Sequence, residues 1–178
     1  NIIRLPYLAR WMISELISCR RSKREAGDSY GAMGGGSPIL KNTQDQAQAL
    51  EKRLNEKGNS KYHVFVCMRY WHPMAVEVVE NVKNWSPDKI VLLPLYPQYS
   101  TTTAKSSFED WNKEAQKQNL IVPSSSLCCW AEEEGFIATS TRLIKETYNR
   151  ALRESGKKPR VLFSAHGLPE KFVTDGDP

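Results

Sequence analysis

The stretch "KIVLLPLYPQYSTTTAKSS" at residues 89–107 decides the fold. Its first seven residues, 89–95, are a nearly continuous apolar run, which predicts a strand buried on both faces. The hydroxyl-rich residues after that run predict a loop, and a helix is predicted from there to about residue 118. A strand that leads through a loop into a helix is the unit from which parallel α/β sheets are built.

The same alternation extends outward along the chain. Further strands are predicted at "YHVFVCM" (62–68), within "LIVPSSSLCCW" (120–130) and at "RVLFSA" (160–165). Apolar residues at helical spacing predict helices before and between these strands, at residues 5–20, about 44–57, 73–85 and about 131–154. Thr43 and Gln46 suggest a capping box for the second helix, and Pro73 fits the first position of the third. The pattern predicts an α/β fold with a parallel sheet of four or more strands, flanked by helices on both faces.

Composition and charge narrow the function classes. The chain has 178 residues, 40% apolar and 25% charged, and it has no apolar run long enough to span a bilayer. A net charge of +5 is mild, so we expect a solvated basic surface and no nucleic-acid partner. The four cysteines show no C-x-x-C spacing, which favours a reducing compartment over a metal cluster. We expect a cytoplasmic protein; the sequence leaves peripheral membrane attachment and oligomeric state open.

Polar, aromatic and charged residues that could bind a ligand follow three of the predicted strands. Because the carboxyl ends of parallel strands meet at one edge, where ligands bind in open α/β sheets, we expect these residues to lie together. Aromatic rings, an arginine, hydroxyls and an imidazole suit a flat, largely apolar ligand with acidic side groups. These residues are Arg69, Tyr70 and His72, then Tyr96, Gln98, Tyr99 and Ser100, and finally Ser164 and His166.

Each of these residues also has a simpler structural interpretation. A histidine at a strand end is more often a hydrogen-bonded structural residue than a ligand, and Arg69 could serve only to pair with a carboxylate. The glycine-rich stretch "GAMGGGS" (31–37) could cradle a phosphate, but it lacks a G-K-[S/T] ending and follows no apolar strand. From the residues alone, the interpretation ends at a ligand site with a basic or metal-binding histidine.

Four stretches together resemble the ferrochelatase family. They are "YGAMGGGSPI" (30–39), "MRYWHP" (68–73), "LPLYPQYSTTTAKSS" (93–107) and "FSAHGLPEKFVTDGDP" (163–178). The resemblance implies Rossmann-like lobes enclosing a cleft, in which ferrous iron is inserted into a porphyrin. It favours protoporphyrin IX over coproporphyrin. The alternatives are a coproporphyrin-using enzyme, another tetrapyrrole metal chelatase, and a phosphate- or nucleotide-binding α/β module.

The resemblance also implies residue roles. His166 is expected to be the catalytic residue and the metal ligand, because a neutral imidazole can accept a pyrrole proton or bind Fe²⁺. Arg69 and Tyr70 are expected on the porphyrin cleft, with Arg69 facing a propionate. Ser37, Tyr99 and Ser100 are expected as further porphyrin contacts.

The resemblance further implies how much of the protein the chain covers. Residues 1–178 are expected to be most of the N-terminal lobe, with the opening strand and the C-terminal lobe outside this chain. Without a second lobe, these residues alone are expected to be inactive. No cofactor is expected beyond the substrate Fe²⁺, and an iron–sulfur cluster in the C-terminal part is left open.

Overall fold

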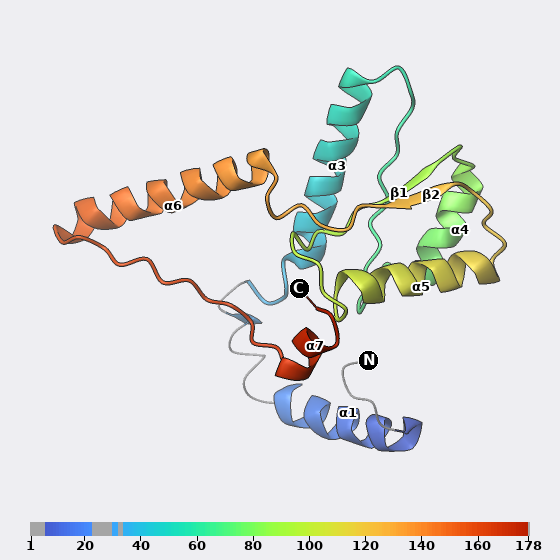
Figure 1. The fold of residues 1–178 in the computed structure, drawn as a ribbon, viewed down its shortest axis with the longest axis horizontal. Helices are drawn as coiled ribbons and strands as arrows, with labels where there is room; N and C mark the ends of the chain where they lie inside the picture. Colours follow the sequence, from blue (N-terminus) through green and yellow to red (C-terminus); the bar gives the residue numbers. More distant parts are fainter. Residues whose placement is uncertain (1–5, 23–29, 32–33, 178) are drawn as a thin grey trace. The chain divides into compact units, whose positions relative to one another are not determined.

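The described part of the chain combines helices with one small parallel sheet (Figure 1). The computed structural model describes residues 6–22, 30–31 and 34–177, so Ala32 and Met33 of the glycine-rich stretch lie outside the described residues. The chain divides into two compact units, Asn1–Asn84 and Trp85–Pro178.

The amino-terminal unit begins with two helices whose positions differ slightly from prediction. Helix α1 spans Tyr7–Ser22, and helix α3 spans Ile39–Lys57. Helix α3 therefore starts before the predicted residue 44, and the predicted capping box is wrong. The hydroxyl of Thr43 instead donates to the carbonyl of Ile39, four residues earlier, at 2.7 Å. Pro38, with φ fixed at −76°, stands directly before the helix.

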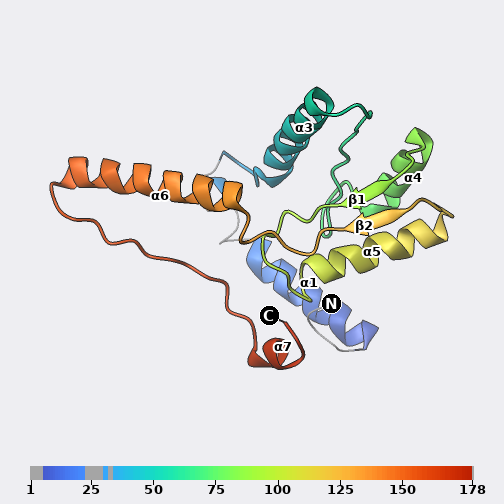
Figure 2. The ribbon, with the colours of Figure 1, turned by 45° about the horizontal axis from the view of Figure 1, so that its top comes forward.

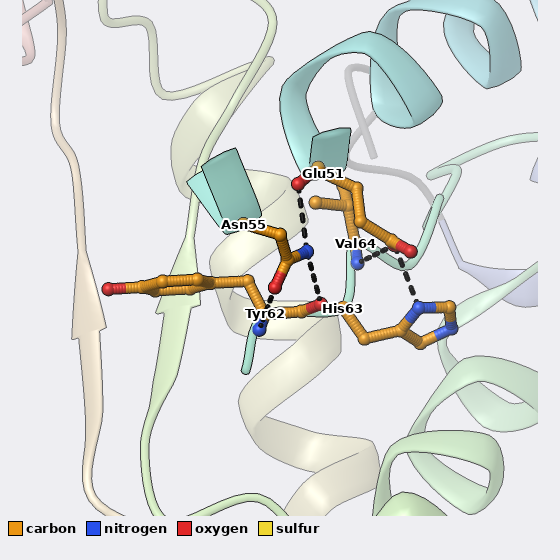
Figure 3. Close-up of polar contacts among 5 residues, drawn as sticks. All are labelled: Glu51, Asn55, Tyr62, His63 and Val64. Carbon is orange, nitrogen blue, oxygen red and sulfur yellow. Dashed lines mark hydrogen bonds and ion pairs between the residues drawn. The ribbon is translucent and has the colours of Figure 1, made fainter. Parts of the chain in front are cut away.

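Among the described residues the strand predicted at 62–68 does not form: this segment has no strand beside it, apart from an isolated bridge between Met68 and Met74. Side chains of α3 hold its first residues (Figure 3). Asn55 accepts from the N–H of Tyr62 at 2.9 Å and donates to its carbonyl at 3.0 Å. Glu51 accepts from the N–H of Val64 at 2.7 Å. Helix side chains thus satisfy backbone groups that a neighbouring strand would otherwise pair.

Removing the Asn55 side chain tests this local contact. Asn55→Ala should lower the free energy of unfolding by about 0.5–1.5 kcal/mol, because backbone groups of Tyr62 exchange protein partners for water. Urea denaturation of the full-length protein measures the change. Gln48→Ala, on an exposed position of the same helix, is the control and should change stability by less than about 0.5 kcal/mol. Equal losses in the two variants would show that the Asn55 contacts contribute nothing.

Helix α4 confirms the predicted apolar spacing. It spans Ala75–Trp85, and its buried residues recur at helical intervals: Ala75, Val78, Val79 and Val82. The helix begins two residues after Pro73, so the prediction that Pro73 is the first helical residue is wrong. The reason is that Met74 remains extended, with the carbonyl of Pro73 accepting from the N–H of Met68 at 2.8 Å.

The carboxyl-terminal unit contains a parallel strand–helix–strand arrangement. Strand β1 (Ile90–Leu92) pairs in parallel with β2 (Ser124–Ser126), and Ile90 lies opposite Ser124. Helix α5 (Ala104–Lys117) connects the strands and runs beside them (Figure 2). The buried side chain of Trp111 lies on this helix. The α/β character and the order strand, loop, helix are confirmed. The strand itself is shorter than the predicted 89–95 and is not buried on both faces, since Val91 is 64% exposed.

The larger predicted sheet is not confirmed. Among the described residues the structure has a two-stranded sheet. The predicted strand at 160–165 is extended chain, and its Leu162 and Phe163 side chains are each 84% exposed. An apolar run becomes a strand only where another strand offers hydrogen-bonding partners, and none pairs with this segment here.

Two helices flank this extended segment. Helix α6 spans Glu134–Ser155, close to the predicted 131–154. The Glu133 side chain caps its start by accepting from the N–H of Gly135, and Gly156 ends it with a φ of +64°, which glycine adopts without strain. Helix α7 is a single short helix, Glu170–Thr174. The segment that carries His166 therefore runs between two defined helix ends.

Candidate functional site

The predicted site residues divide equally between the two units. Ser37, Arg69 and Tyr70 belong to Asn1–Asn84, and Tyr99, Ser100 and His166 belong to Trp85–Pro178. Ser37 is exposed at the end of the glycine-rich stretch, where its hydroxyl accepts from the N–H of Ile39 at 3.4 Å.

Arg69 and Tyr70 form a cation–aromatic pair. The guanidinium carbon of Arg69 lies 4.8 Å from the centroid of the Tyr70 ring, within the range of an attractive cation–π contact. Tyr70 is 59% exposed, so a ligand could contact its ring from solvent. The pair offers a positive charge and an aromatic surface side by side, which are the two features that a flat ligand with acidic groups requires.

His72, in the same stretch "MRYWHP", is held by Glu77, a residue that the sequence did not single out. Nδ1 of His72 lies 2.6 Å from Oε1 of Glu77, and the other oxygen of Glu77 accepts from the N–H of Met74 at 3.1 Å. Glu77 therefore joins the motif to the first turn of α4. An acidic residue in the first turn is a recognisable sequence signal of a helix start, because its carboxylate interacts favourably with the helix dipole and the first-turn N–H groups.

In the carboxyl-terminal unit, a loop follows β1 and leads to α5. Tyr99 on this loop is half-buried, and Ser100 is half-buried beside it. The hydroxyl of Ser100 donates to Oδ2 of Asp177 at 2.7 Å, and the N–H of Thr101 donates to Oδ1 of the same carboxylate. Asp177 is only 5% exposed. Asp177 thus holds the loop that carries Tyr99 and Ser100.

These hydrogen bonds lower the pKa of Asp177 below its ordinary value. The N–H of Thr101 makes the largest contribution and the hydroxyl of Ser100 the next, because both stabilise the ionised carboxylate. Burial acts in the opposite direction but is outweighed. Asp177 is therefore ionised at neutral pH and acts only as an acceptor.

The lowered pKa predicts how stability depends on pH. Above the unfolded-state pKa of about 3.9, both folded and unfolded protein carry the charge, and the stabilisation is fully present. As the pH falls from there through the lower folded-state pKa, protonation favours the unfolded state and the contribution is lost. The stability difference between the unmodified protein and Asp177→Asn should therefore be larger at about pH 7 than at about pH 3. Urea titrations at the two pH values measure it, and an equal difference at both would contradict the account.

His166 does not follow a strand as the sequence predicts, because residues 160–165 form no strand in the structure. It follows the extended segment 160–165, is exposed, and precedes α7 by four residues. The ring is accessible to a ligand from solvent. Asp177, eleven residues further on, is the point where this segment is attached to the loop of Ser100. No local sequence signal could have found that attachment, because the two residues are 77 positions apart.

The described residues contain neither a metal-binding cluster nor a helix that could span a membrane. Across residues 6–22, 30–31 and 34–177, no cluster of three or more histidine, cysteine, aspartate or glutamate side chains is arranged to hold a metal ion. The sulfur atoms of Cys128 and Cys129 are 2.8 Å apart, and both residues are exposed. None of the described helices combines the length and the apolar character needed to cross a bilayer.

The parallel strand–helix–strand arrangement of the carboxyl-terminal unit places the protein in the α/β class, and the same unit carries the exposed His166. The sequence profile of the Ferrochelatase family matches residues 1–178. The chain belongs to the ferrochelatase family.

Individual relatives agree with that assignment. The ferrochelatase of Wolbachia sp. subsp. Drosophila simulans (strain wRi) is 48% identical over 178 residues, covering 100% of this chain and 56% of the relative. That of Phenylobacterium zucineum is 45% identical over 99% of this chain and 50% of its own length. That of Pelagibacter ubique is 40% identical with the same two coverages. The chain spans about half the length of the curated relatives it matches.

Proposed function

We propose that the chain is part of a ferrochelatase that inserts ferrous iron into protoporphyrin IX to form protohaem. The observation that carries the proposal is the match of the Ferrochelatase family over the whole chain. Relatives named ferrochelatase, at 40–48% identity, support it. The substrates are then a porphyrin and Fe²⁺, and the products are haem and two protons.

His166 is proposed as the catalytic residue of this reaction. Iron enters the ring only when the two pyrrole N–H protons leave, so the site needs a base next to the macrocycle. A neutral imidazole can accept a proton at neutral pH and can also bind Fe²⁺ on its way to the ring. The exposed position of His166 supports either use, because its ring is accessible.

Arg69 and Tyr70 are proposed to bind the porphyrin. The Arg69 guanidinium can form two parallel hydrogen bonds with a propionate, and the ring of Tyr70, 4.8 Å away, can lie against the macrocycle. Ser37 and Tyr99 are proposed as further wall contacts. Ser100 fits as a wall contact through its half-buried surface, since its hydroxyl proton is already donated to Asp177.

The finer fold is part of the proposal. We infer that residues 62–68 and 160–165 join β1 and β2 in the full-length protein, giving a Rossmann-like lobe with a sheet of four or more strands. The 84% exposure of Leu162 and Phe163 supports this, since burying such side chains is worth about 1.5–3 kcal/mol each. The enzyme is proposed to need no resident cofactor and to act in the cytoplasm, where the net charge of +5 would also permit attachment to an anionic membrane surface.

A binding titration tests the proposed substrate. The full-length protein is titrated with protoporphyrin IX, with coproporphyrin and with ATP, and the porphyrin spectrum and intrinsic tryptophan fluorescence are followed. We expect saturable binding of protoporphyrin, weaker binding of coproporphyrin and none of ATP. Tighter binding of coproporphyrin would assign the enzyme to that substrate instead, and binding of ATP alone would replace the proposal with a nucleotide-binding module.

A further inference from the structure

Asp177 occupies both of its carboxylate oxygens with one loop. Oδ2 accepts from the hydroxyl of Ser100 at 2.7 Å, and Oδ1 accepts from the N–H of Thr101. Asp177 as a whole is 5% exposed. A buried carboxylate that receives two hydrogen bonds, one from backbone, is a fixed attachment, whereas an exposed ion pair is not.

The hydroxyl of Ser100 has no hydrogen-bonding capacity left. An ionised carboxylate cannot donate, so the single proton of Ser100 points to Asp177. The same oxygen accepts from the N–H of Thr102 at 3.2 Å and lies 2.8 Å from the hydroxyl of Thr102, which must then be the donor. One donated and two accepted bonds are the full complement of a serine hydroxyl. Ser100 therefore serves the attachment and has no proton to offer a propionate.

Asp177 is also tied to the segment that carries His166. Its own N–H donates to the carbonyl of Phe172 in α7 at 3.0 Å, and α7 begins four residues after His166. A continuous chain of contacts therefore leads from the His166 turn through α7 and Asp177 to the loop of Tyr99. All of these residues lie in the unit Trp85–Pro178.

We propose that Asp177 is a positioning residue, which attaches the segment carrying His166 to the loop carrying Tyr99 and so sets the places from which both side chains meet the porphyrin. This inference rests on the proposed function. Without the attachment, the imidazole and the loop can move independently, and a displacement of about 1 Å at a reacting group can reduce a rate by about 100-fold.

The test compares variants of Asp177 and its partner in the full-length protein. Asp177→Ala should lower kcat by about tenfold or more and raise the KM for protoporphyrin, at a temperature where circular dichroism shows the variant to be folded. Asp177→Asn should recover part of kcat, because its amide oxygen can still accept from Thr101. Ser100→Ala should resemble Asp177→Ala, and the double variant should lose little more than either single one, since both remove the same attachment.

Asp175→Asn is the matched control, because Asp175 is an exposed carboxylate two residues away, and it should leave kcat and KM unchanged. Amide hydrogen exchange supplies a readout independent of activity: the N–H of Thr101 should lose protection in Asp177→Ala but not in Asp175→Asn. A normal kcat in folded Asp177→Ala, or unchanged protection of Thr101, would overturn the proposal. If the unmodified protein inserts no iron, the proposed function fails, and the exchange measurement alone then decides whether Asp177 attaches the loop.

Discussion

His166→Ala is expected to lower the rate of iron insertion by about 100-fold or more, while protoporphyrin still binds. The reason is that the variant keeps the chain on either side of the ring but removes the group that we propose to accept the pyrrole protons or to guide Fe²⁺. A positioned acid or base contributes about 10²–10⁴ in rate, whereas an exposed side chain contributes little to the stability of the fold. The measurement is anaerobic haem formation by the full-length protein, with porphyrin binding followed separately by fluorescence.

His63→Ala is the matched control. His63 is also an exposed histidine, and its Nδ1 lies 2.7 Å from Oε2 of Glu51 (Figure 3). We expect its removal to leave the insertion rate of the folded protein within about twofold of normal, because surface substitutions outside a functional site have small effects. Turnover by His166→Ala at the rate of His63→Ala would remove His166 from the mechanism.

Arg69→Ala is expected to weaken protoporphyrin binding by about 1–3 kcal/mol, which is about 5- to 150-fold in the dissociation constant. A charge-assisted pair between guanidinium and propionate has this strength when both parallel hydrogen bonds form. Fluorescence titration of the full-length protein measures the change. The dimethyl ester of the porphyrin, which lacks the charges, should bind the unmodified protein and Arg69→Ala with nearly equal affinity.

Arg69→Lys separates charge from geometry. Lysine keeps the positive charge but cannot form the planar two-bond contact, so its loss of affinity should lie between that of alanine and none. Equal losses for the acid and the ester in Arg69→Ala would instead give Arg69 a structural role, in which its contact with the ring of Tyr70 supports the local chain.

Local patterns in the sequence predicted α1, α3, α4, α5 and α6 to within a few residues, but they did not predict the short α7. The spacing of Ala75, Val78, Val79 and Val82 placed α4 within two residues of its observed start, since a buried helical face repeats within a single element. The stretch 89–107 likewise predicted the order of β1, its loop and α5, although β1 is shorter than the predicted strand. These features depend only on neighbours within about ten residues, and the sequence contains those neighbours.

Contacts between distant segments were not predictable in the same way. The apolar run at 160–165 has the pattern of a strand, but a strand also needs a partner, and the pattern does not say where one lies. No local pattern marks Asp177, yet its carboxylate is bound to Ser100, 77 residues earlier. The residue types of the candidate site were therefore accessible from sequence, whereas the contacts that hold them in place required the structure.

Iron insertion itself tests the account most directly. The full-length protein is supplied anaerobically with Fe²⁺ and protoporphyrin IX, and the absorption spectrum is followed as the free-base porphyrin bands give way to those of haem. We expect catalytic turnover that needs both substrates and is reduced by about 100-fold or more in His166→Ala. Absence of haem from a folded protein that binds protoporphyrin would contradict the proposal that this ferrochelatase-family chain belongs to an iron-inserting enzyme.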